Sequence, residues 1–557
     1  RYRLISDREM TMRKWMFLFF SLAILAGCAR PPAGITPTPA SISPERFPWW
    51  NDSVFYEIFV RSFYDSNGDG IGDFNGITEK LDYLNDGDPD TTSDLGITGI
   101  WLMPICPSPS YHGYDVTDYY AVNPEYGTMQ DFRRLLSEAD RRGIRIIIDL
   151  VLNHTSDQHP WFRSAVSDRN SPQRDWYIWS DKEPGYGGPW GQTVWHSSPT
   201  GYYYGLFVDF MPDLNYDNPA VTAEAEKITA FWLKDVGVDG FRLDAAKHLI
   251  EEGMTQENTP ATHEWFEGYR PVYKGLDPEA LAVGEVAGAD QVVMAEYTQG
   301  DELDLTFDFG QASAILQAAK SGNAPDFAGP MKLTYKLVPN LQYATFIANH
   351  DQNRVLNELG GDIDKAKIAA SLLLTAPGVP FLYYGEEIGL EGQKPDEDIR
   401  RPMQWSADEF AGFSTHLPWR APGSNYTTLN VAAELDDPQS LLSHYRGLIH
   451  LRNGHAALRT GDLAILSTDN PSIFASLRVS EDEAVIVLLN LDDQPVTDYR
   501  LSVEVSSLNA GAYQALPLMG AGAFADLPIS DKGAFKGYTP LAEIPAYATI
   551  IVELRPK

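Results

Sequence analysis

A barrel of eight parallel strands, each followed by a helix, is the fold class that the sequence predicts for most of its 557 residues. One indication is the continuous apolar run at residues 144–152, because a strand buried on both faces of a parallel sheet lacks polar alternation. A second indication is a helix that leads directly into a strand. Asn218, followed by proline, has the pattern of a helix start, Gly237 ends the helix, and a short strand follows at 240–244.

The spacing of polar residues at the strand ends is the third indication. From Asp244 to Glu285 is 41 residues, from Glu285 to Asp351 is 66, and from Asp351 to Tyr384 is 33. One strand–helix unit takes roughly 30 to 40 residues, so these gaps hold one, two and one units and the barrel closes.

The strands of the barrel follow in order from the apolar runs. In such a barrel, the side chains that carry chemistry project from the carboxyl ends of the strands. We expect strands at residues 54–60, 97–104, 144–152, 240–244, up to 285, 303–309, 343–348 and 381–384.

Two further domains are expected beside the barrel. Residues 155–215 are rich in Trp, Tyr, Gly, Pro and Asp without helical periodicity, and we interpret them as a domain inserted after the third strand. In residues 461–557, short β-rich runs alternate with turn residues, which indicates an antiparallel β-sandwich. The barrel then occupies residues 48–154 and 216–460.

The first 47 residues indicate export. Residues 1–27 contain residues upstream of Met12, then two basic residues, and then an apolar run. This run has the length of a signal-peptide core and is too short to span a bilayer. The end of this run, with Cys28, resembles the lipobox of bacterial lipoproteins. That resemblance implies a lipid on Cys28 and attachment to a membrane surface outside the cytoplasm. A secretory signal with an unrelated cysteine is the alternative. Residues 28–47, rich in Pro, Thr and Ser, are expected to form an extended tether.

Composition limits the partners. The net charge of -34 argues against a nucleic-acid partner, because phosphate binding needs basic patches. The chain has only two cysteines, so no disulfide framework supports the fold, and Cys106 is expected to be a packed, unpaired thiol. We expect a monomer.

Five short motifs carry a family resemblance. They lie in order at residues 149–154, 211–215, 240–248, 284–286 and 346–351, each at the end of an apolar run. Together they resemble the motifs of the α-amylase family of glycoside hydrolases, over about residues 48–557. The resemblance implies a (β/α)8 barrel with the two extra domains described above, and a retaining hydrolase that acts on an α-glucan.

The resemblance assigns three carboxyl groups to catalysis. Asp244 is expected to be the nucleophile, Glu285 the acid/base, and Asp351 the group that holds the sugar's hydroxyls. Arg242 lies two residues before Asp244 on the same strand, so it should face the same side and keep that carboxylate ionised. Glu285 should have a pKa raised by burial and by its anionic neighbours.

Contacts with the sugar chain are also implied. Tyr114 is expected to stack on the sugar ring at the cleavage point, because an aromatic ring offers a flat surface to the apolar face of a pyranose. In the inserted domain, Trp190, Trp195, Tyr203 and Phe207 are candidate sugar platforms, with plain packing as the alternative for each. Further contacts are expected from Asp115 with hydroxyls, from His154 and His350 as hydrogen-bond donors, from Arg242, and from Lys247 and His248 on the leaving side.

Structural calcium is the expected cofactor. Residues 65–73 place oxygen-bearing side chains at alternate positions among glycines, which suits a hard divalent cation. Gly76 stands where an EF-hand needs glutamate, so a regulatory EF-hand is excluded, while an ion-free turn cluster remains the alternative. The resemblance implies one calcium held by Asp65, Asn67, Asp69, the Ile71 carbonyl and Asp73, and a second held by Asn153, Asp213 and the His248 carbonyl.

The leading functional hypothesis is therefore an endo-acting hydrolase of α-1,4-glucosidic bonds in starch and maltooligosaccharides. Residues 211–215 and 400–405 also resemble branches that act on cyclomaltodextrins, on pullulan or on α-1,6 bonds, and these activities are alternatives. A surface starch-binding lipoprotein without catalysis is a hypothesis of a different class. It conflicts with the presence of all three acids and of Arg242.

Overall fold

The computed structural model describes residues 47–557 of the chain. The predicted signal peptide at 1–27, the lipid site at Cys28 and all but the last residue of the 28–47 tether lie outside the described residues. Within the described part, no helix combines the length and the apolar character needed to cross a membrane.

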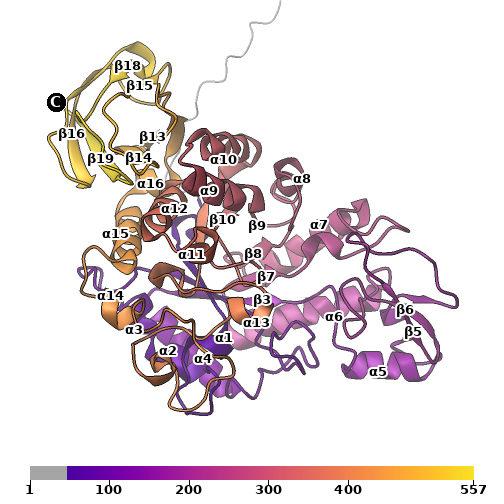
Figure 1. Ribbon diagram of the computed structural model, residues 1–557. Coiled ribbons are helices and arrows are strands. Elements are labelled where there is room, and N and C mark those ends of the chain that lie inside the picture. The colour runs from indigo at the N-terminus through magenta and orange to yellow at the C-terminus, as the bar shows by residue number, and fades with distance from the viewer. Residues whose placement is uncertain (1–46) are drawn as a thin grey trace, which may run out of the picture. The chain divides into compact units, whose positions relative to one another are not determined.

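Eight parallel strands close into a barrel, as predicted (Figure 1). Each barrel strand pairs in parallel with the next barrel strand along the chain, and the last barrel strand pairs with the first. The inserted segment thus separates β3 from β7 in sequence but not in space. In order around the barrel, the strands are β1 (Phe55–Ile58), β2 (Gly99–Leu102), β3 (Arg145–Leu150), β7 (Gly240–Leu243), β8 (Leu281–Gly284), β9 (Leu305–Phe307), β10 (Tyr343–Thr345) and β11 (Val379–Tyr383).

Large side chains fill the barrel interior. Phe55 on β1 stacks on Phe381 of β11, with ring centroids 4.4 Å apart. Cys106 is buried and free, as expected.

Close pairing of β7 and β8 requires the glycine at 240, because a Cβ on Gly240 would lie 2.2 Å from the backbone oxygen of Leu281. This pairing sets the positions of the side chains that follow β7 and β8.

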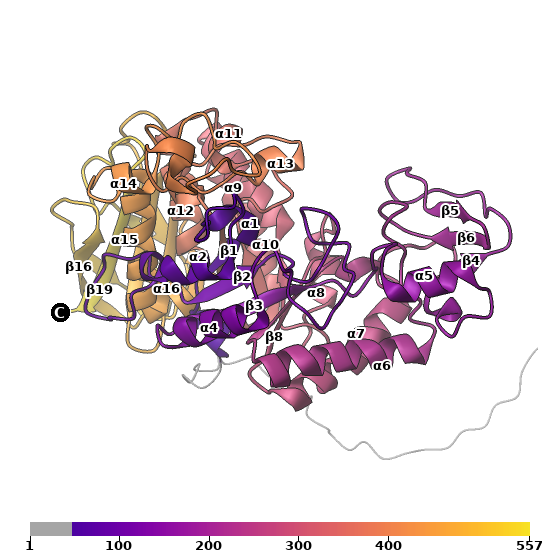
Figure 2. The same ribbon diagram turned by 90° about the horizontal axis from the view of Figure 1, so that it is seen from below.

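Helices surround the barrel (Figure 2). The predicted start of α6 is confirmed, since the Asn218 side chain accepts a hydrogen bond from the Ala220 backbone. The last turns before Gly237 are wound as a π-helix, which the sequence pattern did not indicate. The helices are α1 (Val60–Phe63), α2 (Phe74–Glu79), α3 (Leu81–Leu84), α4 (Met129–Asp140), α6 (Pro219–Ala230), α7 (Pro260–Leu276), α8 (Gln291–Glu296), α9 (Phe309–Ser321), α10 (Pro325–Leu337), α11 (Val355–Glu358), α12 (Ile363–Thr375), α13 (Asp396–Ile399), α14 (Val431–Glu434), α15 (Leu441–Gly454) and α16 (Ala456–Thr460).

The segment inserted after β3 has a small antiparallel sheet of its own. Its strands β4 (Trp179–Ser180), β5 (Trp195–Ser198) and β6 (Gly201–Tyr204) pair in the order β4, β6, β5. The expectation of no helix here was wrong, because α5 spans Pro160–Ser167. With only two turns, α5 buries too few side chains to produce a recognisable periodicity.

The C-terminal region forms two antiparallel sheets, as predicted. A six-stranded sheet has the order β12, β13, β14, β19, β16, β17, and β15 pairs with β18. A separate apolar cluster that includes Ile486, Leu501 and Val552 packs between these strands. The strands are β12 (Asp462–Ile465), β13 (Ile473–Val479), β14 (Ala484–Asn490), β15 (Leu501–Val503), β16 (Gly511–Met519), β17 (Leu527–Ile529), β18 (Phe535–Tyr538) and β19 (Thr549–Pro556).

Candidate active site

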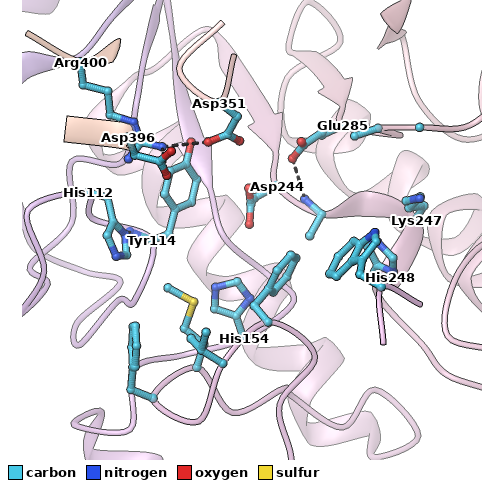
Figure 3. Close-up of a pocket in the computed structure, with 18 residues that line it drawn as sticks. His112, Tyr114, His154, Asp244, Lys247, His248, Glu285, Asp351, Asp396 and Arg400 are labelled. Atoms are coloured by element: carbon cyan, nitrogen blue, oxygen red, sulfur yellow. Dashed lines mark hydrogen bonds and ion pairs between the residues drawn. The ribbon is translucent and has the colours of Figure 1, made fainter. Parts of the chain in front are cut away.

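A cavity of about 520 Å³ lies at the carboxyl ends of the barrel strands, within the usual range for small-molecule sites. Figure 3 shows Asp244 in the middle of this cavity, with labelled side chains on both sides of it. One side holds His112, Tyr114, Asp351, Asp396 and Arg400, and the other holds Glu285, Lys247 and His248.

Arg242 holds three carboxyl groups together beneath the cavity. Asp244 accepts a hydrogen bond from Arg242 Nη1 at 2.7 Å, and Glu285 accepts one from Nη2 at 2.5 Å. Both oxygens of Asp149 on β3 lie 2.9 Å from Nη1. Arg242 was expected to bind substrate, but it is 1% exposed and does not line the cavity. It positions the acids instead, and this follows from its place inside β7.

Burial is the largest influence on the pKa values of these three carboxyl groups. It raises the pKa of Glu285, and the carboxylates of Asp244 and Asp351 raise it further while Arg242 opposes the shift. The direction of this shift is the one expected for an acid that gives up a proton. Burial also raises the pKa of Asp244, and Arg242 opposes this increase, which is the direction expected of it. For Asp149, burial raises the pKa to about 7.

Asp351 is fixed by two cations. Arg400 Nη2 lies 2.8 Å from its Oδ1, and His350 Nε2 lies 3.3 Å from its Oδ2. Although burial lowers the pKa of His350, the carboxylates of Asp351 and Glu57 raise it to about 10, so the ring is charged at neutral pH. Burial opposes ionisation of Asp351, but His350 and Arg400 hold its pKa well below the usual range. Asp351 thus carries a full negative charge into the cavity.

Two residues expected to contact substrate do not line the cavity. His350 is 1% exposed, and its two ring nitrogens are engaged by Glu57 Oε1 at 2.6 Å and by the Tyr114 hydroxyl at 2.7 Å. It does not line the cavity and acts through its neighbours. Asp115 is also buried away from the cavity, because its carboxylate accepts hydrogen bonds from Ser108 and Ser110. Tyr114 does line the cavity, as expected.

His154, Lys247 and His248 line the cavity as the sequence predicted. Burial lowers the pKa of His154 to about 4, so the ring is neutral at pH 7. The His154 Nε2 atom is buried and has no hydrogen-bond partner within residues 47–557. Lys247 forms an ion pair with Glu257, with its Nζ 2.5 Å from Glu257 Oε2. These groups offer polar contacts around an apolar cavity wall.

Exposure separates the four candidate aromatic platforms. Trp190 and Phe207 line the cavity, whereas Trp195 and Tyr203 are at most 9% exposed and pack within the inserted segment.

Several residues that line the cavity were not predicted from the sequence. His112 and Arg400 stood inside segments that were noted for other reasons, and Asp396 lies one helical turn before Arg400 on α13. The missed lining residues are His112, Val208, Phe210, Met211, Ala245, Ala287, Gly288, Asp396 and Arg400.

Residues 57–461 match the model of the alpha-amylase catalytic domain family. This chain belongs to the alpha-amylase family. Its barrel, its inserted segment and the carboxyl groups joined by Arg242 are therefore those of a glycoside hydrolase.

Named relatives of this alpha-amylase family chain include enzymes with different activities. The chain is 43% identical over 451 residues to alpha-amylase 3 of Dictyoglomus thermophilum, covering 80% of this chain and 86% of that protein. It is 33% identical over 521 residues to an oligo-1,6-glucosidase of Parageobacillus thermoglucosidasius, covering 80% and 91%. Among solved structures, an alpha-amylase from H. orenii superposes with a TM-score of 0.78 at 43% identity, covering 90% of this chain and 99% of that one.

The loop after β1 in this family member is a compact turn cluster. Asp65 Oδ1 accepts hydrogen bonds from the backbones of Asn67, Gly68 and Asp69, and Asp73 accepts them from Ser66. This arrangement matches the turn-cluster alternative and also gathers oxygens that suit calcium. Across residues 47–557, no group of three or more His, Cys, Asp or Glu side chains is arranged to hold a metal ion. Calcium at this loop stays a prediction.

The second expected calcium position has a different donor set. Asn153 Nδ2 lies 2.7 Å from the His248 carbonyl oxygen. Asp213 is 1% exposed, and its Oδ2 has no hydrogen-bond partner within residues 47–557. Glu251 Oε1 is likewise buried without a partner in that range. Burial raises the pKa of Tyr204, and the charges of Glu251 and Asp213 raise it further, so both carboxyl groups lie near this hydroxyl. Unpartnered buried carboxylate oxygens beside a carbonyl fit a hard cation, and Glu251 is a candidate ligand that the sequence did not indicate.

Proposed function

We propose that this glycoside hydrolase is an endo-acting, retaining hydrolase of α-1,4-glucosidic bonds in starch and maltooligosaccharides. The observation that carries the proposal is that Asp244 and Glu285 line one cavity and both bond to Arg242 beneath it. Retaining enzymes hold their two carboxyl groups about 5–5.5 Å apart, and inverting enzymes leave about 6.5–9.5 Å for a water molecule. Two carboxyl groups that share one guanidinium favour the closer arrangement.

The proposed reaction has two steps. Asp244 attacks the anomeric carbon while Glu285 gives its proton to the glycosidic oxygen, so the leaving chain departs and a glycosyl ester forms on Asp244. Glu285, now ionised, takes a proton from water, and the resulting hydroxide equivalent displaces Asp244 and restores the starting α configuration. Asp351, fully charged, holds the hydroxyls of the distorted sugar.

Internal cleavage is supported by the shape of the site. Figure 3 shows labelled side chains on both sides of Asp244, so sugars can be bound on each side of the cleaved bond. An enzyme that removes single sugars from a chain end needs contacts for only one sugar on the side opposite the departing chain. An α-1,6 activity is the second candidate, because a named relative is an oligo-1,6-glucosidase and Arg400, from the segment that suggested that branch, lines the cavity.

Product analysis tests the proposal. Amylose should yield a mixture of maltooligosaccharides early in the reaction, and NMR of the first products should detect the α anomer before mutarotation. Release of glucose alone from amylose would contradict endo action, and an initial β anomer would contradict retention. Faster hydrolysis of isomaltose or panose than of maltoheptaose would favour the α-1,6 candidate instead.

We also propose that calcium stabilises the junction between the barrel and the inserted segment. The ligands would be Asp213, Asn153 and the His248 carbonyl, with Glu251 completing the set, and a turn-cluster site would use Asp65, Asn67, Asp69, the Ile71 carbonyl and Asp73. The ion's contribution is positive charge that offsets the buried carboxylates. It takes no part in the reaction.

Removal of calcium by a chelator is expected to lower the Tm. A ligand at about 100 times its Kd stabilises the folded state by about 2.7 kcal/mol. Asp213→Asn should lose part of the calcium-dependent rise in Tm, and Glu251→Gln should lose a similar part. Asp209→Asn, which changes an exposed carboxylate of the same segment, is the matched control. Equal calcium-dependent rises in all four proteins, measured by calorimetry, would refute the junction site.

A further inference from the structure

Trp190 is an exposed indole at the edge of the catalytic cavity. It is 59% exposed, whereas every other tryptophan in residues 47–557 is buried or half-buried. A large apolar ring left in water beside a cavity is typical of a surface that binds something. The ring lines the same cavity as Asp244 and Glu285.

The loop that carries Trp190 is held in place by hydrogen bonds at both ends. The Trp190 backbone donates to Gln192 Oε1 at 3.0 Å, and Gln192 Nε2 donates to the Leu206 carbonyl at 3.0 Å. Two further bonds tie the loop to the barrel segment after β7. Tyr186 donates to the Gly253 carbonyl at 3.2 Å, and Gln256 donates to the Gly187 carbonyl at 3.0 Å. These bonds anchor the loop that presents the indole to the cavity.

The contacts of Trp190 place it on one particular side of the cleaved bond. Its ring lies 5.5 Å from the His248 ring and 5.8 Å from the Phe207 ring, measured between centroids. Figure 3 shows His248 on the Glu285 side of Asp244, opposite Asp351 and Arg400. Because the acid must lie beside the oxygen that leaves, the Glu285 side is the side of the departing chain.

We propose that Trp190 is a stacking platform for glucose on the leaving side, beyond the sugar that Lys247 and His248 contact. This inference rests on the hydrolase function proposed above. A pyranose presents an apolar C–H face, and the exposed indole supplies a flat surface for it. The substrate class it selects is a linear α-1,4-glucan that extends at least two sugars past the cleaved bond. Maltose and other disaccharides are too short to use it.

The test compares two substrates, only one of which places sugars on the leaving side. Maltoheptaose fills that side, whereas α-maltosyl fluoride leaves it empty because its leaving group is a single fluoride ion. Trp190→Ala should lower kcat/KM for maltoheptaose about tenfold, mainly through KM, and should change kcat/KM for the fluoride less than twofold. Trp190→Phe should recover most of the loss. Val505→Ala, which removes an exposed apolar side chain in the C-terminal region, is the control and should change neither.

Each outcome of this test has a definite meaning. An equal loss on both substrates would mean that Trp190 supports the fold or the acids, and no loss on maltoheptaose would mean that it binds nothing; either result overturns the platform. Trp190→Leu keeps an apolar side chain but removes the flat ring, so it replaces the alanine variant if that variant does not fold. Failure of the wild-type enzyme to hydrolyse the fluoride would refute the proposed function itself, which separates the two inferences.

Discussion

Replacement of Asp244 by Asn is expected to lower kcat on amylose by at least about 10⁴-fold without unfolding the protein. An amide oxygen can still accept the 2.7 Å hydrogen bond from Arg242, so the packing of the site should survive. The amide cannot form the glycosyl ester, however, and neither of the other two acids assigned to catalysis is placed to do so. Glu285 lies to one side of the cavity, and Asp351 is held by Arg400 and His350.

Steady-state rates on amylose and thermal melting curves check this expectation, with Asp209→Asn as an exposed Asp-to-Asn control. A 5-fluoro-α-glucosyl fluoride should also label the wild-type enzyme, because it slows the second step more than the first. Mass spectrometry of the digested protein should then find the sugar on the peptide that contains Asp244. A variant that keeps about a tenth of the wild-type rate, or a label on another peptide, would reject Asp244 as the nucleophile.

The positions of Asp244 and Glu285 could be predicted because they depend on the backbone alone. Each follows a short strand by one residue, and parallel pairing brings the ends of β7 and β8 to the same edge. The glycine at 240 makes that pairing possible, and a glycine is readable in the sequence. Elements whose positions follow from periodicity and turn chemistry, such as the start of α6, were predictable for the same reason.

Contacts that depend on loops could not be predicted in this way. Arg400 reaches Asp351 from a segment 49 residues further along the chain, and no local pattern indicates that approach. Asp115 and His350 were assigned to the sugar through the family resemblance, which does not show how each side chain is turned. The chain turns at Gly113, with a φ of 85°, so that Tyr114 enters the cavity while Asp115 bonds to the serines behind it.

Exposure is a second property that the sequence does not reveal. Trp190 and Trp195 lie five residues apart in a segment of uniform composition, but one is 59% exposed and the other 9%. Trp195 belongs to β5 and packs against Tyr204, whereas Trp190 lies in the loop before that strand. The difference depends on which residues enter the small sheet, and the sheet has too few strands to be recognised from alternation alone.

Replacement of Glu285 by Ala is expected to lower kcat on amylose by about 10³-fold, within the range for loss of a general acid and base. The pH profile should change with it. Wild-type activity should fall as the pH rises through the raised pKa of Glu285, because the acid form that protonates the leaving oxygen is lost. It should also fall as the pH drops through the pKa of Asp244, since a protonated nucleophile cannot attack. The alanine variant should keep the acidic limb and lose the alkaline one.

Azide separates the role of Glu285 from that of a nucleophile. With α-maltosyl fluoride, the first step in Glu285→Ala needs no proton, so the glycosyl ester on Asp244 should accumulate because water is no longer activated. Azide needs no general base, and it should enter the space left by the side chain and displace Asp244 to give α-maltosyl azide. If Glu285 were instead the nucleophile, its removal would let azide attack the fluoride directly from the opposite face, and the product would be the β azide. NMR of the product distinguishes the two anomers, and a β product would reverse the roles assigned to the two carboxyl groups.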